Sequence, residues 1–197
     1  MPRAENTPAG GSPGAAERVG AVEQICAAVP PHARPVILID GRSGSGKTTI
    51  ARELAARLPG AQLVRLDELY PGWGGLLAGS RHVVDAVLAT SGPGWRRWDW
   101  GADAAAEWHP LDPALPLIVE GCGALSRAAR SLATLGVWVE LDAVTRKRRA
   151  LERDGAAYAP HWDAWAAQEE EFMARERPRL LADLVIEESA ASGGQPQ

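Results

Sequence analysis

Residues 41–48 carry the clearest chemical pattern in the chain. They read Gly-Arg-Ser-Gly-Ser-Gly-Lys-Thr and match G-x-x-x-x-G-K-[ST], a pattern typical of loops that bind nucleotide phosphates. The glycines let the backbone curl so that its N–H groups converge on phosphate oxygens. The Lys47 ammonium would reach the β- and γ-phosphates, and the Thr48 hydroxyl would bind Mg²⁺. This phosphate loop therefore predicts a nucleotide site, and it says nothing about an acceptor.

Lys47 stands out because only two of the 21 basic residues are lysines. A lysine among so many arginines indicates a position that needs a compact ammonium rather than a planar guanidinium. The loop is expected to follow a strand and to open a helix over residues 46–58, whose N-terminus also favours phosphate. We expect ATP and Mg²⁺ as the cofactors. The predicted nucleotide-binding residues are Gly41, Arg42, Ser43, Gly44, Ser45, Gly46, Lys47, Thr48, Thr49 and, from a later helix, Arg146.

Two apolar runs end at acidic residues that could serve this site. Residues 115–120 deliver Glu120 at the carboxyl end of a predicted strand, where it could join the hydroxyl of the loop around Mg²⁺. Residues 62–66 are followed by Asp67, which could accept the proton of an attacking hydroxyl. Glu68 is the rival for that role, and Asp67 could instead cap a helix or a turn. The predicted metal-binding residues are Thr48 and Glu120.

A basic segment follows Asp142, a residue suited to cap the helix that begins after it. Arg146, Arg149 and Arg153 are spaced i, i+3, i+7 in this helix and therefore share one face. Guanidinium groups aligned in this way can neutralise charge on a phosphoryl group during transfer. The alternative is a solvated basic face, as runs of charge usually are. Because the phosphate loop is also present, we expect this arginine helix to act as a lid. The predicted catalytic residues are Lys47, Asp67, Arg149 and Arg153.

Residues 71–113 form a long stretch without clear periodicity, for which we expect irregular structure and a functional role. Within it, Trp98, Asp99 and Trp100 combine aromatic faces with a carboxylate. Such a combination suits a planar, polar ligand such as a nucleobase with its sugar. Packing is an equal alternative for the two tryptophans.

Three other tryptophans favour a structural interpretation. Trp138 alternates with valines in a predicted strand, and Trp162 and Trp165 share one face of a helix expected over residues 161–176. The same face carries Glu169 and Phe172. We therefore expect this face to pack in the core.

The remaining pattern alternates short apolar runs with helical segments, which is typical of a doubly wound α/β domain. The runs are β-branched or leucine-rich, as in strands buried on both faces of a parallel sheet. A further helix is expected over residues 15–29, before the first run. The runs span residues 35–40, 62–66, 115–120, 136–141 and 182–187.

One domain is expected for 197 residues, here over residues 15–187, with disordered tails at 1–14 and 188–197. A net charge of −4 gives little attraction for nucleic acid or an anionic membrane, so neither partner is expected. No apolar run approaches the roughly 18 residues of a membrane span, and the N-terminus lacks the apolar segment of a secretory signal. The two cysteines match no metal-ligand spacing. These features favour a cytoplasmic protein.

Five blocks, in the same order, resemble the uridine kinase group of P-loop kinases, which includes the phosphoribulokinases and pantothenate kinases. The resemblance runs from about residue 35 to residue 187. The blocks are the loop at 41–49, Leu-Asp-Glu-Leu-Tyr at 66–70, the strand ending in Glu-Gly at 120–121, the lid at 142–154 and Ala-Asp-Leu-Val-Ile at 182–186.

The resemblance implies a three-layer P-loop NTPase fold whose five-stranded parallel sheet has the order 2-3-1-4-5, closed by an arginine lid. It also implies that Asp67 is the base and that Tyr70 lies near the acceptor. One segment departs from the family. Trp98-Asp99-Trp100 could correspond to the Tyr-Asp-Phe of the uridine kinases, but no clear His-x-Arg follows it, whereas a His and an Arg follow Tyr-Asp-Phe in the family. The predicted substrate-binding residues are Tyr70, Trp98, Asp99 and Trp100.

Three functions are consistent with this pattern. The first is a kinase that transfers the γ-phosphoryl group of ATP to a hydroxyl of a small molecule, with a nucleoside as the expected acceptor. The second is a nucleoside monophosphate kinase of the cytidylate type, whose phosphate acceptor needs arginines such as Arg81, Arg96 and Arg97 rather than a base. The third is an ATP-binding regulator or ATPase without a small acceptor, which a complete arginine lid disfavours because it excludes water.

Overall fold

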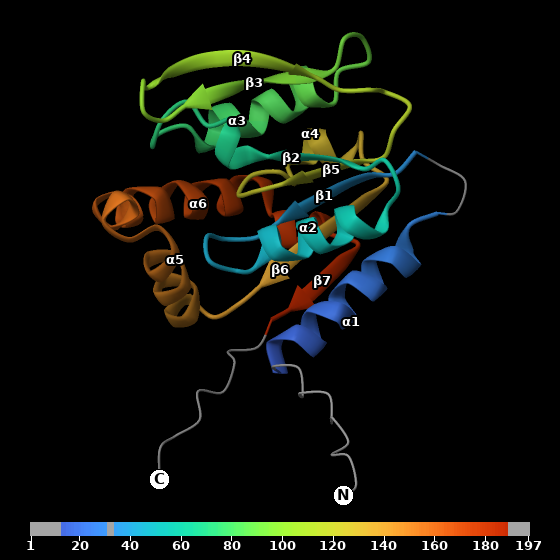
Figure 1. Cartoon of the computed structure of the whole chain (residues 1–197). Helices are drawn as coiled ribbons and strands as arrows, with labels where there is room; N and C mark the ends of the chain where they lie inside the picture. Colours follow the sequence, from blue (N-terminus) through green and yellow to red (C-terminus); the bar gives the residue numbers. More distant parts are fainter. Residues whose placement is uncertain (1–12, 31–33, 189–197) are drawn as a thin grey trace, which may run out of the picture.

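A five-stranded parallel sheet lies between two layers of helices in the computed structural model, which describes residues 13–30 and 34–188 (Figure 1). The helices are α1 (Pro13–Ala28), α2 (Lys47–Arg57), α3 (Leu76–His82), α4 (Arg127–Arg130), α5 (Ala143–Tyr158), α6 (Trp162–Glu176) and α7 (Pro178–Leu181). The strands are β1 (Val36–Asp40), β2 (Gln62–Arg65), β3 (Gly94–Asp99), β4 (Ala104–Pro110), β5 (Leu117–Glu120), β6 (Leu135–Glu140) and β7 (Leu184–Glu187). Short 3₁₀ turns span Leu66–Glu68 and Ala159–His161, and a π turn spans Val83–Val87.

The strand order of the main sheet confirms the predicted fold. The sheet runs β2-β5-β1-β6-β7, and every neighbouring pair is parallel. Counted in chain order among themselves, these five strands have the order 2-3-1-4-5. The labels skip β3 and β4 because those two strands form a separate hairpin.

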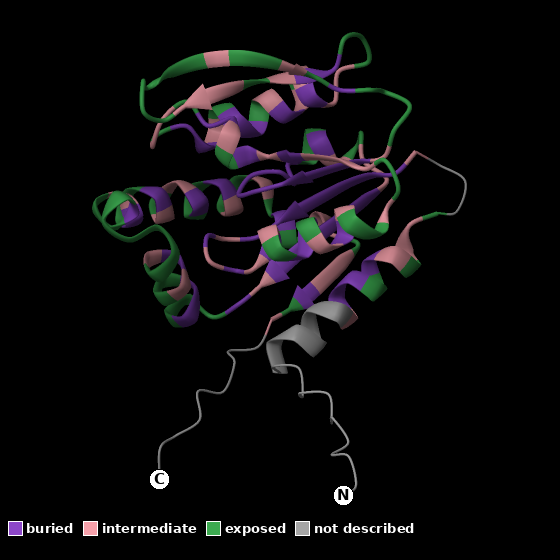
Figure 2. Ribbon diagram, viewed as in Figure 1, coloured by how far each residue is buried: buried purple, intermediate pink, exposed green. Residues whose placement is uncertain are grey.

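Alternate residues of β1 face the two helical layers, which explains why its sequence is continuously apolar. Ile37 and Ile39 pack in the cluster that includes α1 and α2, whereas Val36 and Leu38 pack in the cluster that includes α3 and α6. Figure 2 shows the buried strands between helices whose outer faces are exposed. Trp138, Trp162 and Trp165 are all buried, as predicted, and Glu169 and Phe172 are buried on the same helix as the last two.

The segment 71–113 is more regular than the sequence indicates, so the prediction of irregular structure is wrong. It holds α3, the π turn and the antiparallel hairpin of β3 and β4, which lies above α3 in Figure 1. Most residues of β4 are exposed. A hairpin that buries so little has no alternation of apolar and polar residues, so periodicity did not reveal it.

The chain ends differ slightly from the predicted boundaries. The helix α1 begins at Pro13, so residues 13 and 14 do not belong to an N-terminal tail. Glu188 extends the pairing of β7, because its N–H donates to the carbonyl of Glu140 at 2.9 Å. The predicted tails at residues 1–12 and 189–197 lie outside the described residues. Among residues 13–30 and 34–188, no helix is long and apolar enough to cross a membrane.

Candidate active site

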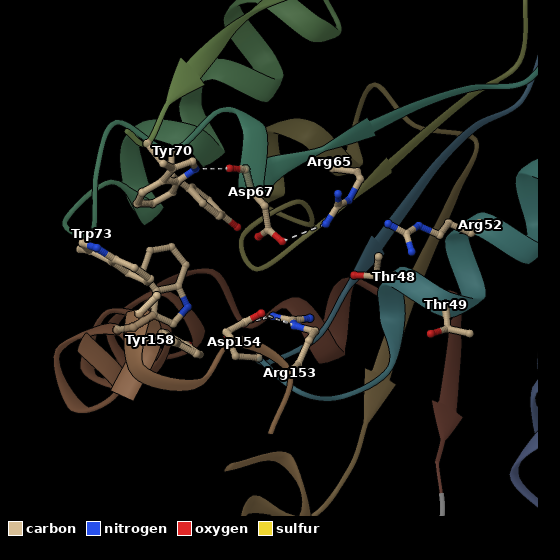
Figure 3. A pocket seen from close by; sticks show the side chains of 14 residues that line it. Thr48, Thr49, Arg52, Arg65, Asp67, Tyr70, Trp73, Arg153, Asp154 and Tyr158 are labelled. Carbon is tan, nitrogen blue, oxygen red and sulfur yellow. Dashed lines mark hydrogen bonds and ion pairs between the residues drawn. The ribbon is translucent and has the colours of Figure 1, made fainter. Parts of the chain in front are cut away.

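Two adjoining cavities open at the carboxyl ends of the central strands. The phosphate-side cavity has a volume of about 310 Å³, and the aromatic cavity has a volume of about 570 Å³. Thr48, Thr49 and Arg153 line both, so the two cavities meet at the start of α2 (Figure 3). The phosphate-side cavity is lined by Gly44, Gly46, Lys47, Thr48, Thr49, Arg149, Arg153 and Glu188. The aromatic cavity is lined by Ser43, Thr48, Thr49, Arg52, Arg65, Asp67, Tyr70, Trp73, Trp100, Arg153, Asp154, Ala157, Tyr158 and Trp165.

The phosphate loop has a backbone that favours glycine at two points. Gly44 and Gly46 have φ angles of 80° and 100°, in the left-handed region. A side chain at Gly44 would also overlap the backbone of Arg146 in α5. Gly46 precedes the first residue of α2, so its N–H and those of the next two residues have no acceptor within the helix. These donors are suited to an anion at the helix N-terminus.

Lys47 is buried beneath this loop and keeps its charge. Burial lowers the pKa of the ammonium, but the neighbouring Cys122, Glu120 and Asp67 outweigh that effect and raise it overall. A buried ammonium at a phosphate site is consistent with its predicted role. The carboxylates of Glu120 and Asp67 supply the negative charge near it.

Asp40, the last residue of β1, fixes the start of the loop. Its buried carboxylate accepts the backbone N–H groups of Gly41 at 2.7 Å, Gly123 at 3.1 Å and Leu125 at 2.8 Å. Burial raises the pKa of Asp40 to about 6, although these hydrogen bonds and Lys47 act in the opposite direction. The carboxylate therefore connects the phosphate loop to the loop that follows β5.

One arginine connects the two predicted acidic residues. Arg65 donates from Nε to Glu120 at 3.2 Å and from Nη2 to Asp67 at 3.3 Å, and the two side chains of Arg65 and Asp67 face each other in Figure 3. Thr48 donates its hydroxyl to the other oxygen of Glu120 at 3.2 Å. Burial raises the pKa of Glu120, and Lys47 and Arg65 oppose that rise. Thr48, Glu120 and Asp67 thus lie together, as the sequence predicted.

The Thr48–Glu120 pair fits a Mg²⁺ site of the kind that nucleotides complete. Among the described residues, no group of three or more His, Cys, Asp or Glu side chains could hold a metal by itself. Magnesium commonly binds through one or two protein oxygens and takes its other ligands from phosphates and water. A hydroxyl and a carboxylate within hydrogen-bond distance beside a phosphate loop match that donor set.

The three arginines of α5 do not share one role. Arg149 and Arg153 line the phosphate-side cavity, where Arg149 pairs with Glu188 at 3.5 Å and Arg153 pairs with Asp154 at 2.6 Å. Asp142 caps the helix through the N–H of the third residue after it at 2.9 Å, as predicted.

Arg146 takes a different direction from the other two, contrary to the expectation of a shared face toward the phosphates. It is buried and donates to the carbonyl oxygens of Leu141 at 3.0 Å and Ser43 at 3.2 Å. It lines neither of the two cavities. Its guanidinium satisfies carbonyl groups just before α5 and in the phosphate loop, and Arg146 also lines a third cavity of about 500 Å³ beside the loop, together with Arg42 and Trp138.

Half of the residues that line the aromatic cavity were not identified from the sequence as site residues, and three of its rings are among them: Trp73, Tyr158 and Trp165. Trp73 stacks on His161 with a ring separation of 4.3 Å and on Tyr158 with a separation of 5.4 Å. Trp165 packs edge-on against Tyr70, whose hydroxyl donates to the carbonyl of Cys122 at 2.8 Å. These rings give the cavity flat apolar walls.

Two of the four predicted substrate-binding residues line the aromatic cavity, and two do not. Tyr70 and Trp100 line the aromatic cavity, and Trp100 donates its ring N–H to the carbonyl of Asp67 at 2.8 Å. Trp98 and Asp99 line neither cavity. The Asp99 carboxylate accepts the N–H groups of the two residues at 101 and 102, because it closes the turn of the hairpin.

Several residues of the site gave little or no signal in the sequence. Arg65 is the last residue of β2 and precedes Asp67 by two positions, so the pair is close in sequence and could have been noticed as a charge pair. Arg52 lies one helical turn after Thr48 in α2, a spacing that could also have revealed it. Trp73 and Tyr158 have no such neighbour in sequence. Their positions depend on how segments 71–113 and 143–158 fold over the sheet.

Comparison with known proteins gives the fold and no closer relationship. No family model matches the chain, and no curated protein matches it. Among solved structures, it is similar to a protein described as a possible uridine kinase from Bacillus stearothermophilus, with a TM-score of 0.60 and 18% sequence identity over 87% of this chain and 98% of that chain. It is also similar to a protein from Silicibacter sp. TM1040 whose name proposes a fructose transport system kinase, with a TM-score of 0.54 and 19% identity over 85% of this chain and 98% of that chain. At these identities the likeness shows the fold alone.

Proposed function

We propose that the chain is an ATP- and Mg²⁺-dependent kinase that transfers the γ-phosphoryl group to a hydroxyl of a small molecule, and that this molecule is a nucleoside. The observation that carries the proposal is the junction of the two cavities, because Thr48, Thr49 and Arg153 line both. A terminal phosphate held by the loop would face a molecule in the aromatic cavity. Transfer requires such an arrangement, since the reacting atoms must approach within about 3–3.5 Å in line.

In this proposal, each residue near the junction has a separate role in phosphoryl transfer. The acceptor oxygen attacks the γ-phosphorus, its proton passes to Asp67, and ADP leaves. Lys47 balances charge on the phosphates, and Arg149 and Arg153 are placed to close over them. Mg²⁺ bound at Thr48 and Glu120 would neutralise further charge on the β- and γ-phosphates.

Asp67 is suited to the base role by position and by its support. It lines the aromatic cavity, and its side chain is about half exposed. Arg65, which also donates to Glu120, donates a hydrogen bond to its carboxylate. A general base must reach the proton that it removes. An exposed carboxylate at the boundary of the acceptor cavity meets that condition, whereas Glu68 does not line the cavity.

The walls of the aromatic cavity favour a flat acceptor. Trp73, Trp100, Tyr158 and Trp165 present rings to a volume of about 570 Å³, which is ample for a base and its sugar. The name of the similar protein from Bacillus stearothermophilus points to the same acceptor class. Arg81, Arg96 and Arg97, the arginines named for a phosphate acceptor, do not line this cavity, although Arg52, Arg65 and Arg153 do.

An ADP-release assay with defined acceptors tests the proposal. Purified protein with ATP and Mg²⁺ would be given uridine, cytidine or CMP, with mass spectrometry of the products and Lys47→Ala as the inactive control. We expect ADP release and a phosphorylated nucleoside with uridine or cytidine. Release with CMP alone would favour the nucleoside monophosphate kinase. Hydrolysis that no metabolite changes would favour the ATPase or regulator.

A further inference from the structure

The third cavity, beside the phosphate loop, shares no lining residue with the phosphate-side cavity or the aromatic cavity. Its volume of about 500 Å³ is in the range of small-molecule sites. Its walls come from the phosphate loop, the end of β6, the start of α5, the end of α6 and α7. A molecule bound in the third cavity would therefore lie apart from both the nucleotide and the acceptor.

Positive charge exceeds negative charge in the walls of the third cavity. Four arginines line it, against two carboxylates. The arginines are Arg42, Arg146, Arg177 and Arg179. Both carboxylates already accept hydrogen bonds from the protein, since Glu140 accepts the ring N–H of Trp138 at 2.8 Å and Asp142 caps α5. Two of the arginines, Arg42 and Arg179, pair with carboxylates within 3.4 Å. The other two arginines carry the excess charge.

Arg146 is the buried member of this pair. Only 4% of its surface is exposed, and its Nε and Nη1 groups donate to backbone carbonyl oxygens. Among residues 13–30 and 34–188, no carboxylate pairs with Arg146 and no acceptor meets its Nη2 group. Burial and the nearby charge of Arg42 lower the pKa of the Arg146 guanidinium. An anion in the third cavity would balance this charge.

Arg177, the exposed member of the pair, occupies a position where glycine is the usual residue. It ends α6 with a φ angle of 57° and a ψ angle of 52°, in the left-handed region. Residues other than glycine are uncommon in that region, and glycine commonly ends helices there. Within the described part of the chain, the Arg177 guanidinium has no hydrogen bond or ion pair. The strained backbone and the unpaired cation together favour a role in binding.

The rest of the wall is largely apolar. Leu141, Met173, Pro178 and Leu180 line the third cavity beside Trp138. Leu180 has 75% of its surface exposed, so a ligand could cover it. An inorganic anion would leave this apolar surface in water, whereas a ligand with an apolar group would bury it.

We propose that the third cavity binds a phosphate monoester that carries an apolar group, with the phosphate held by Arg146 and Arg177. A phosphate monoester has close to two negative charges at neutral pH, which matches two arginines without carboxylate partners, whereas a carboxylate has one. The planar guanidinium suits phosphate oxygens because it can donate two parallel hydrogen bonds. The proposal is independent of the kinase proposal, since it involves neither the phosphate-side cavity nor the aromatic cavity.

Calorimetry with phenyl phosphate, in the presence of excess ADP and Mg²⁺, tests this site. Arg177→Gly removes the guanidinium and suits the left-handed backbone. We therefore expect its thermal unfolding temperature to be unchanged or higher, while the Kd for phenyl phosphate rises at least about tenfold. Arg177→Lys keeps the charge, and its Kd should rise less than about fivefold. Arg175→Ala removes an arginine of the same helix that does not line the third cavity, and its Kd should be unchanged.

Each outcome bears on the site or on its ligand. If the unmodified protein did not bind phenyl phosphate, or if Arg177→Gly bound it equally well, the site would be overturned. Orthophosphate carries the charge without the ring and should bind at least about tenfold more weakly than phenyl phosphate. Equal affinity for the two would overturn the proposed ligand class. Should Arg177→Gly not fold, Arg177→Gln decides, because it removes the charge and keeps a long side chain, and the same loss is expected. The comparison holds whether or not ADP binds, so failure of the kinase proposal would not alter it.

Discussion

The two cavities of the site are built in different ways. The phosphate-side cavity is formed largely by one continuous loop, whose backbone supplies the donors, and by two arginines of one helix. The aromatic cavity is formed by side chains from α2, the end of β2, the residues before α3, the hairpin turn, α5 and α6. A site made of consecutive backbone groups needs a fixed spacing of residue types, whereas a site made of scattered side chains needs only the right shape. The first is therefore far more visible in a sequence than the second.

The strongest test of this contrast is the loss of a single charge on the phosphate side. We expect Lys47→Ala to lower kcat about 10³-fold or more, because one preorganised positive group facing a transferring phosphoryl group contributes on the order of 4 kcal/mol. The chain supplies its own control, since Lys147 is the other lysine and its side chain is half exposed. Steady-state ADP release should be unchanged in Lys147→Ala. Comparable rates in the two variants would contradict the assignment of the phosphate side.

The next largest effect is expected where the two cavities meet. Asp67→Asn should lower kcat about 10²–10³-fold while the Kd for ATP stays within about threefold, because a base acts on the acceptor proton and not on nucleotide binding. Glu68→Gln is the matched control, as a neighbouring carboxylate that does not line the cavity. Single-turnover rates and ATP calorimetry on both variants give the measurement. If Glu68→Gln were the slower variant, the base would be the other carboxylate.

The sequence predicted the fold, and it predicted that Thr48 and Glu120 meet beside the loop, for a physical reason. Gly44 and Gly46 adopt left-handed backbone that strongly favours glycine, so the local conformation accounts for these residue types. Thr48 and Glu120 lie far apart in the chain, yet parallel strands end at one edge of the sheet, so their meeting followed from the strand pattern.

Half of the aromatic side, including Trp73 and Tyr158, escaped prediction because tertiary contacts place those residues. The helix α5 is interrupted at Gly155, where φ is 54°, and nothing in a helical pattern shows how that interruption turns Tyr158 over Trp73. Glu169 was expected to pack in the core and does so, but burial alone did not reveal that its carboxylate meets the phosphate loop. The 3.6-residue period reports which face of a helix is buried, and it does not report which group lies opposite.

A third prediction concerns the side chain that supports the phosphate side. The pKa of Asp40 is raised to about 6 from an ordinary 3.8, so the folded protein binds this proton more tightly than the unfolded chain does between about pH 4 and 6. The free energy of unfolding therefore falls as pH rises through this window, by at most about 3 kcal/mol from this group. Asp40→Asn cannot titrate. Urea unfolding from pH 4.5 to 7 should show a smaller decline for Asp40→Asn than for the unmodified protein, and parallel curves would exclude this pH dependence.

The smallest expected effect is on the aromatic side, where many contacts share the binding energy. Trp73→Ala should raise the KM for uridine about tenfold and leave the Kd for ATP unchanged, because stacking of a base on an aromatic ring contributes about 1–3 kcal/mol. Trp108→Ala removes an equally large ring from β4, which is 42% exposed and lines neither cavity. Its kinetics should match those of the unmodified protein. A change in ATP affinity in Trp73→Ala would show that the two cavities do not divide nucleotide from acceptor, because this ring lies only on the aromatic side.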